Sequence, residues 1–296
     1  MYLLPCLIFA GSLFAATPLS TPSHIRPYRR PITTWIAPYA VKRSFEAIRV
    51  PQVAGILTHL DLQFWEPTSD GAIRLVEEPE VSLDAVEKLR NWGHEQGIRV
   101  MLCAFNGERD WDWPLAKHAF SDHCDGFVDS LVHEVDRLDL DGIDVDLEGP
   151  AQYESDKPAF LSFIAALSKE MHSRRKQLTV DSFCYIWNAP NQGWWADLFR
   201  SVDAVNCMGY DETGCAAPEW RSFAALKKAA GAHTDKLSIG MLSGRDKWQG
   251  SPLAEHLAWI EKDNTMGVAI WDAQFRSSAW KSTDVLKALA SIRRGR

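Results

Sequence analysis

The stretch DGIDVDLE at residues 141–148 combines the apolar spacing of a buried strand with a row of acidic side chains. In a strand, successive side chains point to opposite faces. One face would carry Ile143, Val145 and Leu147, and the other Leu140, Gly142, Asp144, Asp146 and Glu148. Burying several carboxyl groups together is costly and raises the pKa of at least one of them. Such arrangements are typical of active sites, so we predict that this strand carries catalytic residues.

A solvated acidic loop and a calcium loop are the alternative interpretations of this stretch. The D-x-D-x-D spacing suits calcium, but the intervening residues are apolar. The stretch also lacks the glycine at the sixth position and the glutamate at the twelfth position that an EF-hand needs. No CxxC, HExxH or clustered histidine pattern suggests another metal. We therefore predict a catalytic strand with no metal and no cofactor.

Eight short apolar runs alternate with helical patterns along the chain, which is typical of a parallel α/β barrel rather than a sandwich. Ser82 is expected to cap the helix that follows it, and apolar residues recur at helical spacing from Phe127 to Leu138. A closing helix is expected over residues 283–292. The expected strands lie near residues 32–37, 55–64, 98–106, 140–148, 178–185, 203–210, 236–243 and 266–271.

Three motifs together resemble glycoside hydrolase family 18, the chitinase family. Residues 141–148 match its D-G-x-D-x-D-x-E signature at every specified position. Residues 208–211, MGYD, resemble its M-x-Y-D motif at the sixth barrel strand, and residues 267–271, GVAIW, resemble its Trp-terminated eighth strand. The resemblance covers about residues 32–290. It implies an α/β fold, the (β/α)8 TIM barrel, in which chemistry lies at the C-terminal ends of the strands.

The resemblance also implies roles for individual residues. Glu148 would be the general acid, and Asp146 would orient a 2-acetamido group and stabilise an oxazolinium ion. Asp144 would share a proton with Asp146, because two like charges at short range cannot both ionise cheaply. Tyr210 would hold the acetamido group. The expected substrate-binding residues are Asp211, which would contact sugar hydroxyls, Trp271, which would form the floor under the reacting sugar, Met208 and Asp141.

The chain departs from the family pattern after the third strand. The family often has S-x-G-G there, whereas this chain has Ala104-Phe105-Asn106-Gly107. The loss of a glycine is expected to reshape the subsite floor and with it the choice of substrate. Tryptophans that follow strand ends are candidate walls for sugars, although core packing is the alternative for each: Trp65, Trp111, Trp113, Trp187 and Trp248.

Composition limits the domain organisation and the partners. The chain has 296 residues, 46% hydrophobic, with a net charge of -7 and no long basic block, so the charge pattern of a nucleic-acid binder is missing. Residues 1–20 are expected to be a secretory signal peptide, 21–30 a linker and 31–296 a single catalytic domain. An uncleaved anchor is the alternative for the leader, but its apolar run is too short for a comfortable transmembrane helix. We expect a secreted or periplasmic monomer without stable membrane insertion.

The cysteines do not suggest a disulfide framework. Without Cys6 in the leader, five remain at irregular spacing. Cys103, Cys184 and Cys207 fall in apolar runs and are expected to be small buried hydrophobic residues.

The sequence therefore predicts a retaining, substrate-assisted hydrolase of β-linked N-acetylglucosamine glycans such as chitin or chitooligosaccharides. An endo-β-N-acetylglucosaminidase acting on N-glycans and a glucosaminidase acting on peptidoglycan are alternatives with the same chemistry. A non-catalytic chitinase-like lectin is the alternative from a different class. Loss of the terminal glutamate is the usual mark of such lectins, and Glu148 is present.

Overall fold

The computed structural model describes residues 30–107, 111–210, 220–245, 247–248 and 251–295. The main sheet follows the order β1-β13-β10-β9-β7-β5-β4-β2-β3, and a further pairing of β1 with β2 closes it into a barrel. Every pairing in the closed barrel is parallel. The barrel strands are β1 (Ile32–Ile36), β2 (His59–Pro67), β4 (Arg99–Phe105), β5 (Gly142–Asp146), β7 (Gln177–Ser182), β9 (Ala204–Cys207), β10 (Leu237–Leu242) and β13 (Gly267–Trp271).

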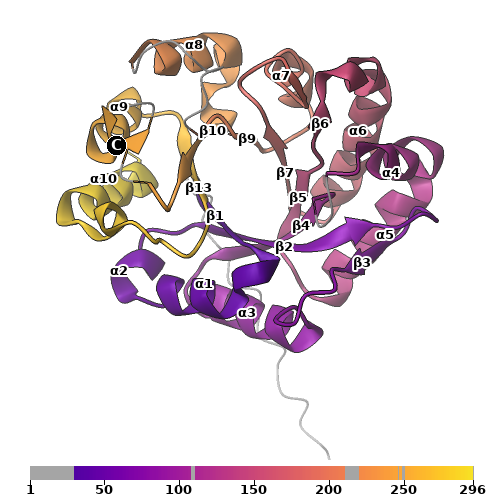
Figure 1. Ribbon diagram of the computed structural model, residues 1–296, viewed down its shortest axis with the longest axis horizontal. Helices are drawn as coiled ribbons and strands as arrows, with labels where there is room; N and C mark the ends of the chain where they lie inside the picture. Colours follow the sequence, from indigo (N-terminus) through magenta and orange to yellow (C-terminus); the bar gives the residue numbers. More distant parts are fainter. Residues whose placement is uncertain (1–29, 108–110, 211–219, 246, 249–250, 296) are drawn as a thin grey trace, which may run out of the picture.

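Helices surround the barrel, as Figure 1 shows in an end-on view. They are α1 (Val41–Ile48), α2 (Pro51–Ala54), α3 (Leu83–Glu95), α4 (Trp113–Lys117), α5 (Cys124–Arg137), α6 (Lys157–Ser173), α7 (Trp195–Leu198), α8 (Trp220–Ala230), α9 (Leu253–Asp263) and α10 (Thr283–Arg294). Short 3-10 segments cover Pro38–Ala40, Ala151–Asp156, Gly231–Lys236 and Ser278–Lys281, and one π-helical turn covers His118–Asp122. The predicted TIM barrel is confirmed.

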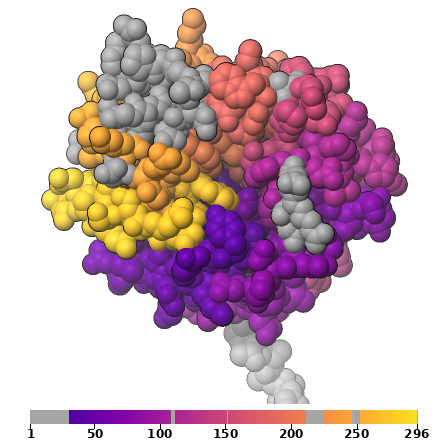
Figure 2. All heavy atoms as spheres, viewed as in Figure 1, coloured from indigo at the N-terminus to yellow at the C-terminus, as the bar shows by residue number. Residues whose placement is uncertain are grey.

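The two ends of the domain lie side by side. Thr33 and Thr34 of β1 pair with Ala269 and Ile270 of β13. In Figure 2 the indigo surface of the first elements accordingly borders the yellow surface of the last ones. Closure of this kind removes the free edges that an open sheet would expose.

The alternation in β5 sorts its side chains as the sequence predicts. Ile143, Val145 and Leu147 are fully buried in the large apolar cluster that also contains the inward faces of the helices. A small separate cluster inside the barrel contains Trp35, Cys103 and Ala269, with Trp271 packed on it. The rest of the barrel interior is largely polar, and this is where the carboxyl groups lie.

Local signals fix the helices next to the barrel. Ser82 caps α3 by accepting a hydrogen bond from the amide of Ala85 at 3.2 Å, as predicted. Phe127, Leu131 and Val135 form the buried face of α5. Gly142 allows β5 and β7 to approach each other, because a Cβ at this position would lie 2.2 Å from the carbonyl oxygen of Gln177.

The second strand differs from the sequence expectation. It begins at His59 rather than near residue 55, and it continues to Pro67, where it pairs in antiparallel fashion with β3 (Ile73–Leu75). The expected segment included residues 55–58, which contain the apolar pair Ile56 and Leu57, but these residues form the turn after α2. This extension of β2 forms one wall of a pocket described below.

Two further expectations are changed by the structure. Cys184 is buried but disulfide-bonded, whereas Cys103, Cys124 and Cys207 are free, so the partner of Cys184 lies outside the described residues. Arg30, assigned to the linker, is already part of the folded domain, because its buried Nε donates to the carbonyl of Met266 at 2.8 Å. The predicted signal peptide and residues 21–29 lie outside the described residues. None of the helices in the described part of the chain has the length and apolarity needed to cross a membrane.

Candidate active site

The carboxyl ladder runs along the inner face of β5 to the C-terminal rim of the barrel. Asp144 and Asp146 are 0% and 2% exposed, and Glu148 lies two residues beyond the last strand residue, where it is partly exposed. The three predicted residues therefore lie on one face at increasing height. This is the end of the barrel at which TIM-barrel enzymes carry their chemistry.

Asp144 is the deepest of the three and is held by neutral donors. The indole Nε1 of Trp35 donates to its Oδ2 at 2.9 Å, and the hydroxyl of Thr179 donates to its Oδ1. Burial raises the pKa of Asp144, and the hydrogen bonds from Thr179 and Trp35 oppose that rise. Asp144 is fully buried and does not line the pocket that contains Asp146 and Glu148.

Asp146 lies between a neutral donor and a second carboxyl group. The side-chain amide of Gln63 donates to its Oδ2 at 2.7 Å. Burial, together with the charge of Asp144, raises the pKa of Asp146 from 3.8 to about 7, while the hydrogen bonds from Gln63 and Glu148 oppose this rise. Asp146 can therefore change its charge near neutral pH.

Glu148 is a carboxyl group at the rim whose surroundings favour its protonated form. Burial raises its pKa well above the usual value, and the charge of Asp146 and a hydrogen bond to Asp146 raise it further. The same hydrogen bond lowers the pKa of Asp146. These shifts favour a pair in which Glu148 keeps the proton and Asp146 carries the negative charge, which is the state a general acid needs.

The main chain of Glu148 is fixed by the side chain of Asn106. The ladder between β4 and β5 ends at the pair Phe105 and Asp146. One step further, Asn106 Nδ2 donates to the carbonyl of Glu148 at 2.9 Å, and the amide of Glu148 donates to Asn106 Oδ1 at 2.9 Å. Asn106 is 5% exposed. A side-chain amide thus continues the ladder after the strands themselves have ended.

A pocket of about 240 Å³ opens above the ladder. Its polar lining includes Gln63, Asp146, Glu148, Asp181 and Tyr210, and its apolar and aromatic lining includes Trp111, Phe183, Tyr185, Met208 and Trp271. We call it the catalytic pocket. Of the predicted site residues, it brings together Asp146, Glu148, Met208, Tyr210 and Trp271, with Asp144 buried beneath them.

Tyr210 is placed to act as a neutral hydrogen-bond donor. Burial raises the pKa of its hydroxyl well above the usual value, and the charges of Asp181, Asp146 and Glu148 raise it further. The hydroxyl therefore keeps its proton and can donate it to an acceptor in the catalytic pocket.

Two predicted substrate-binding residues are not seen in this pocket. Asp211 lies outside the described residues. Asp141 lies just before β5, at the opposite end of the barrel from Glu148, where its Oδ2 accepts from the amide of Val100 at 2.7 Å and bonds to His94 Nε2 at 2.9 Å. The structure therefore does not bring Asp141 together with the catalytic ladder.

Sequence reasoning missed two further buried carboxyl groups. Asp181 on β7 lines the catalytic pocket and accepts a hydrogen bond from Asn206 Nδ2 at 2.9 Å. Asp61 on β2 lies lower in the barrel, and neither of its carboxyl oxygens has a hydrogen-bond partner among the described residues. Burial raises the pKa of both groups well above the usual value, and the charges of Asp144 and Asp146 add to this. Both would be found by applying the alternation of β5 to the expected strands that contain them.

The candidate tryptophan walls divide into two groups. Trp65 and Trp113 are buried core residues, and their indole nitrogens donate to Glu134 and Asp156. Trp111 and Trp187 are 41% and 50% exposed. Trp111 lines the catalytic pocket, and Trp187 stacks on Tyr185 at 4.4 Å between ring centroids. The side chain of Trp248 is not described.

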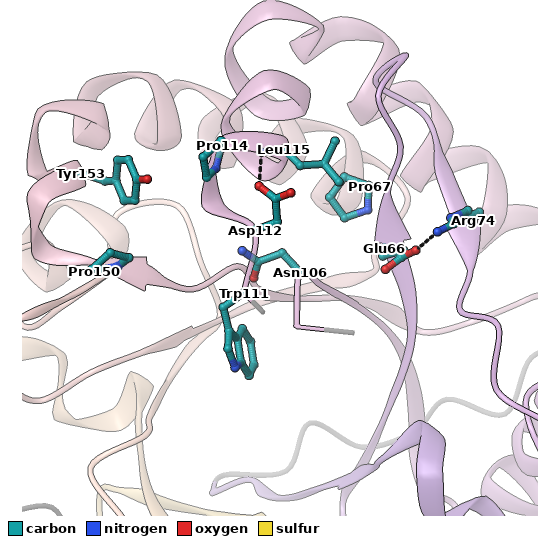
Figure 3. Close-up of a pocket in the computed structure, with 10 residues that line it drawn as sticks. All are labelled: Glu66, Pro67, Arg74, Asn106, Trp111, Asp112, Pro114, Leu115, Pro150 and Tyr153. Atoms are coloured by element: carbon teal, nitrogen blue, oxygen red, sulfur yellow. Dashed lines mark hydrogen bonds and ion pairs between the residues drawn. The ribbon is translucent and has the colours of Figure 1, made fainter. Parts of the chain in front are cut away.

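A second pocket, about 530 Å³ in volume, borders the first. Figure 3 shows its lining, which comes from the ends of β2 and β4, from β3, from the start of α4 and from the segment after Glu148. Trp111 lines both pockets. We call this space the outer pocket. Neither pocket contains a cluster of metal ligands, since no group of three or more His, Cys, Asp or Glu among the described residues could hold a metal ion.

A TIM barrel with carboxyl groups at its C-terminal rim, one of them a glutamate, is consistent with a barrel glycoside hydrolase. The chain belongs to glycosyl hydrolases family 18, whose family model matches residues 36–281. A search among curated proteins gives no match.

Solved structures support the same fold. A chitinase from Chromobacterium violaceum ATCC 12472 is 16% identical, with a TM-score of 0.71, and the match covers 90% of this chain and 100% of that chain. The spore cortex-lytic enzyme SleL of Bacillus cereus is 13% identical, with a TM-score of 0.68, and the match covers 90% of this chain and 76% of that chain. The chitinase ChiB of Flavobacterium johnsoniae is 15% identical, with a TM-score of 0.67 and coverage of 90% and 94%.

Proposed function

We propose that this protein is a retaining, substrate-assisted glycoside hydrolase that cleaves β-linked N-acetylglucosamine glycans such as chitin or chitooligosaccharides. The observation that carries the proposal is the row of carboxyl groups on β5, which rises from buried Asp144 and Asp146 to Glu148 at the C-terminal rim. Asp146 and Glu148 line a pocket that is also lined by Tyr210 and Trp271.

The reaction follows from these positions. Glu148 transfers its proton to the glycosidic oxygen, and the bond from that oxygen to the anomeric carbon breaks. The carbonyl oxygen of the substrate's own acetamido group forms the new bond to the anomeric carbon, which gives an oxazolinium ion. Asp146 accepts the hydrogen bond of the amide N–H and stabilises the positive charge, while Tyr210 donates to the acetamido oxygen and orients it.

In the second half of the reaction Glu148 acts as a general base. Glu148, now ionised, takes a proton from water, and the hydroxide that results attacks the anomeric carbon and opens the oxazolinium ring. The product then has the β configuration, and Glu148 recovers its proton. Two successive displacements at one carbon retain the configuration, as in the substrate-assisted exceptions to the two-carboxylate mechanism.

Asp181 is the other carboxyl group in the catalytic pocket that could act as a nucleophile. Burial and the charges of Asp144 and Asp146 raise its pKa well above the usual value, against the opposing hydrogen bond from Asn206, and so favour a neutral group, which is a poor nucleophile. A substrate with hydroxyl in place of the 2-acetamido group separates the two mechanisms. It is expected to be almost inert, whereas attack by Asp181 would leave it cleavable.

The substrate class is tested by mass spectrometry of products. The wild-type protein is incubated with chitin oligomers, peptidoglycan and a high-mannose glycopeptide, and Glu148→Gln serves as the control. We expect cleavage of the chitin oligomers and a loss of about 10²- to 10⁴-fold in the control, because general acid help is removed. Cleavage of peptidoglycan alone would favour the glucosaminidase. Sugar binding without any cleavage by the wild type would favour the lectin.

We also propose that the protein is exported and acts as a monomer on a glycan outside the cytoplasm. The apolar run with small residues behind it at positions 1–20 supports export.

A further inference from the structure

The outer pocket lies on the leaving-group side of the proposed reaction. In that reaction the sugar with the acetamido group occupies the catalytic pocket with Asp146, Tyr210 and Trp271, and Glu148 protonates the oxygen that links it to the next sugar. The next sugar must therefore lie beyond Glu148. Asn106, which bonds to the main chain of Glu148, and Pro150, two residues after it, both line the outer pocket.

The outer pocket has the size and lining of a sugar site. Its volume of about 530 Å³ lies within the range of about 300–1,000 Å³ that is usual for ligand pockets. Trp111 stands between the two pockets with a partly exposed indole, and Tyr153 lies on the opposite side from Arg74 in Figure 3. Aromatic faces of this kind can stack on sugar rings.

The described lining of the outer pocket has one more acidic residue than basic residues. Glu66 and Asp112 are acidic, and Arg74 is the one basic residue in the described lining. Arg74 already bonds two carboxylates, because NH2 pairs with Glu66 and NH1 pairs with Glu77 at 3.1 Å. Its charge is therefore offset by its own neighbours. The nearby Lys117 is likewise engaged, at 2.8 Å from Asp156.

The carboxyl pair Asp146 and Glu148 lines the catalytic pocket on the other side of Trp111 and adds its negative charge to the electrostatic potential in the outer pocket. A carboxylate on the leaving group would meet Asp112, Glu66 and the charge shared by Asp146 and Glu148. A neutral sugar would meet no such repulsion, and an ammonium group would be attracted.

From this arrangement we infer that the outer pocket is a leaving-group site that selects neutral or cationic amino sugars and rejects sugars that carry a carboxylate. This inference rests on the proposed function. It selects N-acetylglucosamine and glucosamine units, as in chitin and partly deacetylated chitin. It disfavours N-acetylmuramic acid whose lactyl carboxyl group is free and ionised, that is, a muramic acid unit without its peptide.

The test uses three substrates that share the same N-acetylglucosaminyl chain and differ only in the leaving sugar. The leaving sugars are N-acetylglucosamine, glucosamine and N-acetylmuramic acid. For the wild type, kcat/KM for the muramic acid substrate is expected to be at least about tenfold below that for the neutral substrate at low salt. Because charges are screened over about 3 Å at 1 M salt, the difference should shrink there. A purely steric barrier to the lactyl group would not respond to salt.

Substitutions in the outer pocket test which residues cause the discrimination against the carboxylate. Asp112 Oδ1 caps α4 by accepting from the amide of Leu115 at 2.9 Å, and Asn keeps this cap, so Asp112→Asn removes the charge with little change in structure. It should raise the relative rate on the muramic acid substrate by about threefold. Glu66→Gln should raise it further, because Arg74 would then face the pocket with one carboxylate fewer. The control is Asp129→Asn, an exposed residue outside both pockets that changes the net charge equally and should leave the ratio unchanged.

The affinities of the Glu148→Gln variant for the same three substrates are measured by calorimetry. The preference for neutral or cationic leaving sugars is then determined independently of hydrolysis. No cleavage of any substrate by the wild type, with the binding preference intact, would refute the proposed function and leave the charge selection standing. Equal rates and equal affinities for the neutral and muramic acid ligands would overturn the inference. A preference unmoved by salt and by both pocket variants would overturn it as well.

Discussion

Asn106 and Glu148 exchange two hydrogen bonds of 2.9 Å, from the side chain of one to both main-chain groups of the other. The residue that replaces a glycine of the family pattern thus sets the position of Glu148, the proposed general acid. Burial of Asn106 leaves little freedom to this contact. A rigid contact of this kind is what a proton donor needs, because small displacements of a reacting group are costly in rate.

Asn106→Ala removes both bonds and leaves two partly buried main-chain groups of Glu148 unsatisfied. We expect kcat to fall by about tenfold or more, with KM little changed, and the free energy of unfolding to fall by roughly 1–3 kcal/mol. The high-pH limb of the rate profile should also move, because the position of Glu148 relative to Asp146 changes. Steady-state kinetics over a pH series tests this, with exposed Asn91→Ala on α3 as control. Lost stability with an unchanged kcat and pH profile would mean that Asn106 is only structural.

The rate should depend on pH through the pair Asp146 and Glu148. The active pair holds one proton, on Glu148. Below the pKa of Asp146, which is raised to about 7, the pair gains a second proton and loses the charge that stabilises the oxazolinium ion. Above the pKa of Glu148, which is raised well above its usual value, the general acid is lost. We therefore expect a bell-shaped profile of kcat/KM whose acidic limb lies near neutral pH. Asp146→Asn should be much slower and should lack that limb, and a profile that rises steadily toward pH 4 would contradict this account.

The interior carboxyl groups should make the fold less stable as pH rises. The folded-state pKa of Asp146 is raised from 3.8 to about 7, so the folded state binds the proton more tightly than the unfolded chain does. The stability that results is complete below pH 3.8 and is lost as pH rises through about 7, with an upper limit of roughly 4 kcal/mol for this group. Asp61, whose pKa is also raised, contributes in the same direction.

Asp61→Asn mimics the protonated group and should flatten this dependence. Denaturant unfolding at pH 4 should show little difference from the wild type, whereas at pH 8 the variant should be more stable by about 1 kcal/mol or more, because no charge needs to be buried. Exposed Asp125→Asn on α5 is the matched control. A variant that is destabilised equally at both pH values would show that the carboxylate of Asp61 is needed in ionised form.

The leader is expected to be removed on export. The secreted form should lack the first ~16 to 25 residues, on the strength of the apolar run and the small residues that follow it. N-terminal sequencing of the mature protein checks this. Recovery of intact Met1 in membrane fractions would support the alternative of an uncleaved anchor.

The sequence was informative where one strand carries the signal by itself. The alternation over residues 141–148 places Asp144, Asp146 and Glu148 correctly, because faces of a strand follow from local periodicity. The same alternation does not predict that Asp141 lies before the strand and bonds to His94, because the ends of a strand depend on the neighbouring strands. The partners of the ladder, such as Gln63 and Trp35, come from strands about 80 to 110 residues away, and only the closed barrel brings them there.

The role of Asn106 is also not predictable from the local sequence. In the sequence it is only a departure from S-x-G-G, and the expectation was a reshaped subsite floor. In the structure its side chain continues a ladder that no local pattern reveals. The disulfide at Cys184 was missed because cysteine spacing does not determine pairing.

The central claim is that the anomeric carbon undergoes two displacements and keeps its configuration, as substrate assistance requires, and the anomeric form of the fresh product tests it most directly. Wild-type protein is mixed with chitooligosaccharide, and NMR spectra are recorded before mutarotation, with Glu148→Gln as the control that should give no early product. The account predicts an initial product in the β form, because attack by the acetamido oxygen and then by water inverts the anomeric carbon twice. An initial product in the α form would show a single inversion and would contradict substrate assistance.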